Sequence, residues 1–395
     1  MNPLHFSRQV AYKINNSSLF SQPAKYLSSA EYAKKFDAKW HKVYDRMPSK
    51  RSPPVYYSAL KVDIQKKLDA EFPEAGVLEL NNPLLYGQAG LILSKEGYLL
   101  LDHSWYSQHA EEVKKTPRYF SRNKSLKGVC LSLASDFAVG SYGHFLLDCL
   151  SRLELFNKAG FKLIDIDYVF CPKPPSKTAQ RLFDKLGIPA SKCIWADENK
   201  NMTVQVETLL APTFPGTRRN YPEWLPAFIQ SEFLPYPLPV PSRRLYISRA
   251  GCRRNVVNEE AIIRILIQHG FEIYNPSQET EQPRDFAESA VVVGAHGGGL
   301  ADLVFCQPGT KVLELIPTDH VYPYYYSLSD AAKLDYGCLI CRSTDERGED
   351  AFGPSHYNFH VNEDEFNTAL AQITNETSFN RLGTISFSKG VETDL

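Results

Sequence analysis

A glycine-rich loop beside a histidine is the feature of the sequence with the clearest chemistry. Residues 291–305 read VVVGAHGGGLADLVF, an apolar strand followed by a loop and a helix, and the loop holds His296, Gly297, Gly298, Gly299 and Leu300. Glycines let a backbone approach a ligand closely, and a helix N-terminus offers free N–H groups with partial positive charge. The pattern predicts a diphosphate-binding loop in which His296 donates to a phosphate oxygen or a sugar hydroxyl. The alternative is a tight turn whose glycines serve packing alone.

Charged residues follow two other predicted strands of the same region. After strand 243–248 the chain reads SRAGCRRNVVNEE, which supplies Ser248, Arg249, Arg253 and Arg254. The carboxyl ends of parallel strands share one edge, so these residues should lie beside the glycine loop, where guanidinium forks suit phosphate oxygens. Glu314 stands near the end of the next strand, where a carboxylate can accept ribose hydroxyls. A solvated basic loop and a solvent-facing glutamate are the alternatives.

A histidine and an aspartate share one face of a predicted helix over residues 143–158. His144, Asp148 and Arg152 stand at i, i+4 and i+8 of the segment GSYGHFLLDCLSRLELF. That spacing places them on one stripe, where a His–Asp pair can act as a general base with an orienting carboxylate. The alternative is a structural ion pair on a capped helix.

Other motifs point to no metal or dinucleotide site. Asp165-Ile166-Asp167 has the D-x-D form that metal-dependent sugar transferases use, but it precedes a strand instead of following one. G-x-G-x-x-G and G-x-x-x-x-G-K-[ST] are both absent, which disfavours a Rossmann dehydrogenase and a P-loop protein. Cys338 and Cys341 form a CxxC without a second pair or a histidine cluster, so we predict no metal site.

The order of predicted elements is that of an α/β protein with two domains. Strands and helices alternate on both sides of a proline-rich connector, EFLPYPLPVPS, at residues 232–242. We expect an N-terminal extension (1–75), an N-terminal α/β domain (76–235), a C-terminal Rossmann-like domain (236–345) and a tail (346–395) placed against the N-terminal domain. Two such domains should face a central ligand cleft.

Local signals predict several boundaries. We expect a helix over residues 30–47, a hairpin turning at residues 95–97 and a helix that starts after an N-cap at Asn258 and ends before Gly270. The charged face around Lys34 and Lys42 could touch acidic lipid, although a solvated face is favoured.

Composition narrows the functional classes. With 44 basic and 45 acidic residues the formal net charge is −1, which argues against a nucleic-acid binder. No apolar run reaches the ~18 residues of a membrane helix, and no signal peptide is evident. The 8 cysteines do not make a disulfide scaffold in a chain of 395 residues. We therefore expect a cytoplasmic protein.

Together these segments resemble glycosyltransferase family 61, the group that includes DUF563-type capsular polysaccharide enzymes. The resemblance covers most of residues 140–340, and it implies a GT-B-like fold of two Rossmann-like domains with the donor nucleotide on the C-terminal one. Asn258 and Glu259 match the family's Asn-Glu element, residues 296–300 match its HGxGL element, and either Arg253 or Arg254 matches its arginine. Asp302 departs from the family, which often has Asn there.

The resemblance implies inverting, metal-independent transfer from a nucleotide sugar, usually a UDP-sugar, to a glycan or lipid-linked acceptor, with no further cofactor. We expect an enzyme of bacterial capsule or lipopolysaccharide synthesis, peripherally associated with the inner face of the plasma membrane. Asp148 is the preferred base, paired with His144, while Glu259 and Asp136 remain candidates. The rival interpretations are a non-catalytic protein that binds a nucleotide sugar or glycan, and a metal-dependent GT-A transferase using Asp165 and Asp167.

Overall fold

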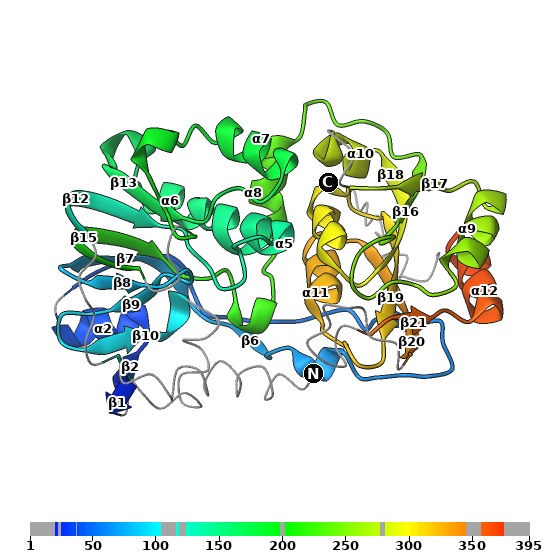
Figure 1. Ribbon diagram of the computed structural model, residues 1–395, viewed down its shortest axis with the longest axis horizontal. Coiled ribbons are helices and arrows are strands. Elements are labelled where there is room, and N and C mark those ends of the chain that lie inside the picture. Colours follow the sequence, from blue (N-terminus) through cyan, green and yellow to red (C-terminus); the bar gives the residue numbers. More distant parts are fainter. Residues whose placement is uncertain are drawn as a thin grey trace, which may run out of the picture.

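The chain folds into two α/β halves, each built on a largely parallel sheet (Figure 1). The computed structural model describes residues 20–22, 25–36, 38–103, 116–117, 124–197, 202–276, 281–344 and 357–374. Within these residues, no helix has the length and apolar character needed to span a bilayer. The α/β class predicted from the alternation of elements is confirmed.

The first sheet has a parallel centre extended by antiparallel strands. β12 (Lys124–Ser132) lies between β13 (Tyr168–Cys171) and β15 (Thr203–Pro212), and β14 (Cys193–Trp195) pairs with β13, all in parallel. The other strands pair in antiparallel fashion. β7 (Ala75–Asn81) and β8 (Leu84–Tyr86) both pair with β15, β9 (Leu91–Leu93) pairs with β8, and β10 (Tyr98–Leu100) pairs with β9. β9 and β10 form the predicted hairpin. β2 (Lys25–Leu27) pairs with β10, and β3 (Lys39–Tyr44) pairs with β7.

The second sheet is parallel through five neighbouring strands, as the alternation predicts. The order is β17 (Glu272–Tyr274), β16 (Arg243–Ile247), β18 (Ser289–Ala295), β19 (Lys311–Pro317) and β20 (Asp335–Ser343). Helices α9 (Glu259–Gln268), α10 (Gln282–Ala287), η8 (Gly298–Phe305) and α11 (Tyr324–Ala331) connect them. Gly270 follows α9 with a φ of 72°, a left-handed conformation that suits glycine after a helix.

The helix after β12 is irregular, although its position agrees with the prediction over 143–158. It runs as α5 (Tyr142–His144), a π-helical turn η3 (Phe145–Cys149), a 3-10 turn η4 (Leu150–Arg152) and α6 (Leu153–Lys158). The first half is completed by α7 (Lys177–Lys185) and α8 (Trp224–Phe233). π turns often occur at functional sites.

The two halves share one apolar core. A continuous cluster of buried side chains contains Leu147 and Ile229 from the first half and Leu300, Val304 and Leu328 from the second. Figure 1 shows α5, α8 and α11 between the two sheets; α8 and α11 supply part of this cluster, and Tyr142 of α5 packs against it. Separating the two halves would expose this shared apolar surface to water, so their arrangement is part of the fold itself.

Three predictions about the N-terminal region and the tail are wrong. The predicted helix over residues 30–47 is instead α2 (Ser29–Phe36) followed by β3, because Trp40–Tyr44 pairs with β7. Residues 1–75 are not a separate extension, since β3 joins the first sheet and β5 (Val55–Tyr56) pairs with β20 in the second. The described part of the tail, residues 357–374, packs on the second half instead: β21 (Phe359–His360) pairs with β20, and α12 (Glu363–Thr374) buries Phe366 in the core of the second sheet.

Arg152 has a structural role and does not extend the His144–Asp148 stripe. Its buried guanidinium donates to the carbonyl oxygens of Ser132, Ala134 and Pro212, which lie at the carboxyl ends of β12 and β15. Burial lowers its pKa to about 10, so the group stays charged. It therefore holds together the two strands from which the catalytic candidates emerge.

We predict that Arg152→Met lowers the free energy of unfolding by about 2–4 kcal/mol, because three carbonyl groups lose their donor. Urea denaturation measures this change. The control is Arg284→Met, which removes an exposed ion pair within α10 and should alter stability by less than about 0.5 kcal/mol. Equal effects of the two substitutions would contradict a structural role for Arg152.

Candidate active site

The candidate site residues follow the carboxyl ends of parallel strands from both sheets. His144 and Asp148 follow β12, and the Arg249 segment follows β16. The glycine loop follows β18, and the loop that leads to α11 follows β19. In open α/β sheets this edge is where ligands bind.

His144 and Asp148 form a hydrogen-bonded pair on the irregular helix. His144 Nδ1 lies 2.9 Å from Asp148 Oδ2, and the side chains are 25% and 5% exposed respectively. The pair is thus confirmed as a contact, with the histidine on the accessible side and the aspartate behind it. This order suits an imidazole that meets substrate and a carboxylate that orients it.

Arg219 and Tyr221, which follow β15 in the chain, complete the surroundings of Asp148. Arg219 Nε lies 3.3 Å from Asp148 Oδ2, and Tyr221 Oη donates to Oδ1 at 3.2 Å. Arg219 has a φ of 60°, an uncommon conformation for a residue with a side chain. Sequence reasoning missed both residues. The signal was available, because basic residues after a strand are the pattern that singled out Arg249.

The electrostatics assign the proton positions. Burial opposes ionisation of Asp148, but Arg219, His144 and Tyr221 outweigh it and hold its pKa below the usual value. Arg219 Nε also lies 3.3 Å from His144 Nδ1, but Asp148 Oδ2 is nearer at 2.9 Å and an ionised carboxylate only accepts, so we place the imidazole hydrogen on Nδ1 and the lone pair on Nε2. Burial and Arg219 lower the pKa of His144, which keeps the imidazole neutral near pH 7. His144 is therefore the better base, and the preference for Asp148 in that role is replaced by an orienting one.

The glycine loop is shaped around the Arg249 guanidinium. A Cβ on Gly297 would lie 1.5 Å from Arg249 Nη1, so only glycine leaves room for this side chain. A Cβ on Gly298 would meet nothing within 4 Å, so open space lies in front of that residue. The helix begins at Gly298, earlier than predicted, and has 3-10 geometry. The interpretation that these glycines serve packing alone does not account for the open side at Gly298.

The glycine loop and the base helix touch each other. A Cβ on Gly143, the residue before His144, would lie 3.3 Å from the Ala301 Cβ and 3.7 Å from the Gly298 carbonyl oxygen. Beside this contact, Tyr142 donates to Oδ1 of the buried Asp302, and burial raises the pKa of Asp302 to about 7. Asp302 therefore belongs to the contact between the halves and not to the anion site.

His296 is oriented by a carboxylate and a phenol. Its Nδ1 lies 2.5 Å from Glu314 Oε1, and Tyr336 Oη donates to Glu314 Oε2 at 2.5 Å. Glu314 is fully buried with both oxygens engaged, so the predicted contact with ribose hydroxyls is wrong and the residue positions His296 instead. Burial lowers the pKa of His296, with Glu314 opposing and Arg254 and Arg249 adding to the shift.

Arg254, and not Arg253, faces this histidine. Arg253 is exposed, whereas Arg254 Nη1 lies 2.7 Å from His320 Nε2, and the ring of His320 packs 4.9 Å from that of His296. Burial and neighbouring Arg249 lower the pKa of Arg254 to about 10. The Nε atoms of Arg249 and Arg254 are both buried without a hydrogen-bond partner. Two half-buried cations, each with a buried Nε donor to spare, are suited to an anionic ligand.

The Asn-Glu element supports the Arg249 turn from behind. Glu259 Oε1 accepts hydrogen bonds from Tyr246 Oη and Ser248 Oγ, both at 3.0 Å, which fixes where the turn leaves β16. Asn258 does not cap α9 with its side chain; it exchanges two hydrogen bonds with the backbone of Val361. Ser248, Glu259 and Asn258 are therefore positioning residues in this structure. The predicted N-cap position of Asn258, directly before α9, is confirmed, although its side chain binds Val361 instead of the helix.

A row of tyrosines joins the base cluster to the anion cluster. The rings of Tyr322 and Tyr324 stack at 5.1 Å, and the Tyr324 ring lies 6.1 Å from His296. On its other side, the Arg219 guanidinium lies 5.2 Å from the Tyr324 ring. Sequence reasoning assigned the YYY run only to a helix, although aromatic residues directly after a strand could have signalled a site.

The D-x-D motif lies elsewhere. Asp165 and Asp167 stand before β13, at the end of the sheet opposite His144, and Asp167 Oδ2 accepts from the Val129 amide at 2.8 Å. Within the part of the chain that the structure describes, no group of histidine, cysteine, aspartate or glutamate is arranged to hold a metal ion.

The fold and the site define an α/β protein in which a His–Asp pair from the first half lies beside a candidate anion-binding edge of the second half. Residues 142–313 match the family described as Glycosyltransferase 61, so the chain contains a glycosyltransferase family 61 domain. The chain is also 45% identical over 59 residues to the beta-1,2-xylosyltransferase RCN11 of Oryza sativa subsp. japonica. That match covers 15% of this chain and 11% of the rice protein.

We predict that Arg249→Ala weakens UDP binding about 10- to 100-fold, because a charge-assisted contact worth about 1.5–3 kcal/mol is lost. Gly297→Ala should weaken binding similarly, since its methyl group displaces the same guanidinium. Isothermal titration of both single variants and the double variant forms a double-mutant cycle. If Gly297→Ala acts through Arg249, it adds little in the Arg249→Ala background, whereas fully additive losses would refute this connection.

Proposed function

We propose that this protein is an inverting, metal-independent glycosyltransferase with a GT-B-like arrangement, which moves a sugar from a UDP-sugar to a glycan hydroxyl. The observation that carries the proposal is the contact between Gly143 and the 298–301 segment, because it places the candidate base next to the candidate anion loop. The family 61 match supports the same reaction class.

In the proposed reaction the acceptor hydroxyl attacks the anomeric carbon while the bond from that carbon to the diphosphate oxygen breaks. His144 Nε2 takes the hydroxyl proton, and Asp148 stabilises the resulting imidazolium through Nδ1–H. The bond electrons pass to the leaving diphosphate. Direct displacement by an acceptor on the opposite face inverts the anomeric configuration.

Arginines can replace a metal ion in this proposal. Arg249 and Arg254 bring two half-buried cations to the loop where the diphosphate would lie, and fixed donors in a partly desolvated site stabilise developing negative charge more strongly than water does. The proposed donor is a UDP-pentose or UDP-hexose, and the name of the rice relative makes UDP-xylose the first to test. The proposed product is a bacterial surface polysaccharide, as the family resemblance suggests.

The decisive experiment incubates the protein with a panel of UDP-sugars, with and without EDTA, and follows release of UDP. Slow UDP release, accelerated by the correct acceptor and retained in EDTA, is expected. Binding of UDP-sugars without any release would favour the non-catalytic interpretation, and loss of release in EDTA would contradict metal independence.

We predict that His144→Gln lowers kcat by about 10²–10⁴-fold with UDP affinity nearly unchanged, because a general base contributes by that factor. Wild-type kcat should fall as the pH decreases through the lowered pKa of His144, since protonation removes the base. Asp148 raises the pKa of His144, so Asp148→Asn should move this acidic limb to lower pH as well as reduce kcat. Full activity of either variant would remove this pair from the mechanism.

A further prediction concerns proton uptake. Because the pKa of His296 is lowered in the free protein, and an anion would favour its imidazolium, UDP binding near pH 7 should take up a proton. UDP affinity should then rise as the pH falls from 8 towards 6. Titration calorimetry in buffers of different ionisation enthalpy measures the uptake, which should disappear in His296→Gln. Uptake that persists in this variant would assign it to another group.

A further inference from the structure

A segment outside the family match crosses between the two halves. Residues 45–72, here called the strap, leave the first sheet after β3, add β5 to the edge of the second sheet beside β20, and return to the first sheet at β7 (Figure 1). The two halves are thus joined twice by this segment, in addition to the connector at residues 234–242.

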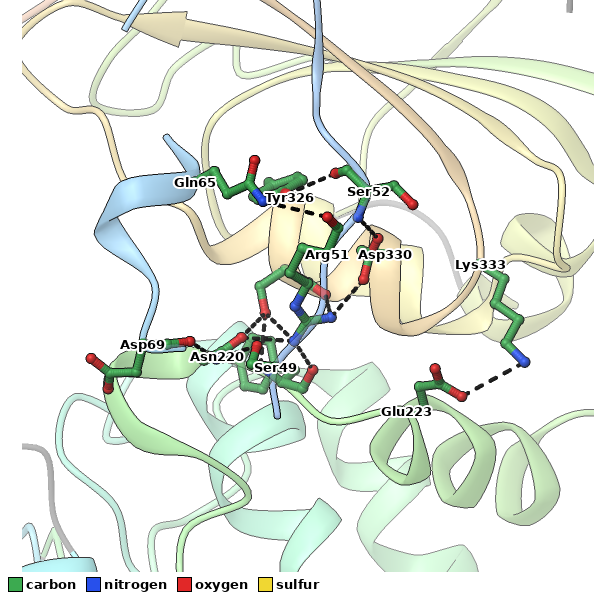
Figure 2. Close-up of polar contacts among 12 residues, drawn as sticks. Ser49, Arg51, Ser52, Gln65, Asp69, Asn220, Glu223, Tyr326, Asp330 and Lys333 are labelled. Carbon is green, nitrogen blue, oxygen red and sulfur yellow. Dashed lines mark hydrogen bonds and ion pairs between the residues drawn. The ribbon is translucent and has the colours of Figure 1, made fainter. Parts of the chain in front are cut away.

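Arg51 is the centre of the strap's contacts, and its side chain is 4% exposed (Figure 2). Nη1 donates to Asp330 Oδ2 at 3.0 Å and to the Ser327 carbonyl oxygen at 3.2 Å, both on α11. Nη2 donates to Asn220 Oδ1 at 2.7 Å and to the Tyr221 carbonyl oxygen, both after β15. One nitrogen of the guanidinium therefore serves mainly the second half, and the other serves mainly the first.

The acceptors of Arg51 belong to the segments that carry the site. Asn220 and Tyr221 directly follow Arg219, and Tyr221 Oη donates to Asp148. Ser327 and Asp330 lie on α11, whose first residue is Tyr324. A planar guanidinium fork thus fixes the base cluster relative to the tyrosine row and His296.

Other strap residues hold the same segments. Asn220 Nδ2 donates to Ser49 Oγ at 2.9 Å and to the Asp69 carbonyl oxygen at 3.1 Å. Lys67 Nζ donates to the Val321 carbonyl oxygen at 2.6 Å, in the loop between His320 and Tyr322. The strap therefore holds both the segment that follows Arg219 and the loop that leads to the tyrosine row.

We propose that Arg51 is a positioning residue for glycosyl transfer, which sets the distance between the His144 base cluster and the anion loop. This inference rests on the proposed function. Catalysis depends steeply on such alignment, and a misplacement of ~1 Å caused by a distant substitution can cost about 10²-fold in rate. Arg51 touches neither His144 nor Arg249, so its effect should fall on turnover and not on UDP binding.

The test compares Arg51→Lys with the control Glu223→Gln. Lysine keeps the charge beside Asp330 but lacks the fork that reaches both halves. Glu223 makes a 3.7 Å ion pair with Lys333 that also links the two halves, but both side chains are exposed (Figure 2), so its loss should have little effect. We expect Arg51→Lys to reduce kcat about 10- to 100-fold with the UDP dissociation constant changed less than about 3-fold, and Glu223→Gln to match the wild type.

Two further readouts do not depend on activity. NMR titration of His144 should show a shifted midpoint in Arg51→Lys, and amide exchange at residues 217–221 should accelerate. If the wild type neither binds UDP nor transfers sugar while these readouts still change, the proposed function fails and Arg51 remains a positioning residue for the His144 cluster. If kcat and the His144 midpoint both equal those of the wild type, the proposal is overturned.

Should Arg51→Lys not fold, Asp330→Asn provides the same test, because it keeps Arg51 and its contacts to Asn220 and Tyr221 while weakening the link to α11. It should show the same loss of kcat at constant UDP affinity, in smaller degree. An unchanged kcat in a folded Asp330→Asn variant would overturn the proposal.

Discussion

Half-buried positive charge at the meeting point of two sheets is the constraint on which the rest of the site depends. Arg249 and Arg254 are desolvated, lie close enough for Arg249 to lower the pKa of Arg254, and each retain a buried Nε without a partner. Burying a cation without a matching anion is costly. An anionic ligand would supply the missing partner.

The carboxylates around the site are arranged so that they do not cancel that charge. Asp148 is engaged by His144, Arg219 and Tyr221, while Glu314 is engaged by His296 and Tyr336. Glu259 accepts from Tyr246 and Ser248. Each acid thus orients a neighbouring group, and the guanidinium groups of Arg249 and Arg254 stay available to a ligand. The same arrangement of charged groups keeps His144 neutral and able to accept a proton.

The two halves do not act as independent units in this fold. They share one apolar core, β5 of the strap lies in the second sheet although β3 and β7, which precede and follow the strap, lie in the first, and Arg51 binds acceptors in both. The family match begins at residue 142, so the strap lies outside it, yet it touches the segments that carry Arg219 and Tyr324. Positioning of the site is therefore spread over more of the chain than the conserved-looking motifs indicate.

Local patterns were sufficient to predict much of this protein. The strand–helix alternation predicted the parallel order of the second sheet, and the i, i+4 spacing predicted the contact between His144 and Asp148. Predictions failed where a distant partner decided the outcome. Trp40–Tyr44 is a strand because β7 pairs with it, and Glu314 is turned inwards by His296 and Tyr336.

By itself, therefore, the sequence determined which side chains carry chemistry and which strand ends present them, because hydrophobic period, turn residues and helical spacing act over a few residues. Only the tertiary structure decided that Arg219 joins Asp148 across 71 positions, that Arg254 and not Arg253 faces His296, and that Arg51 reaches Asp330 across 279 positions. Such contacts depend on how whole elements pack, and no local pattern records which distant acceptor a buried arginine will meet.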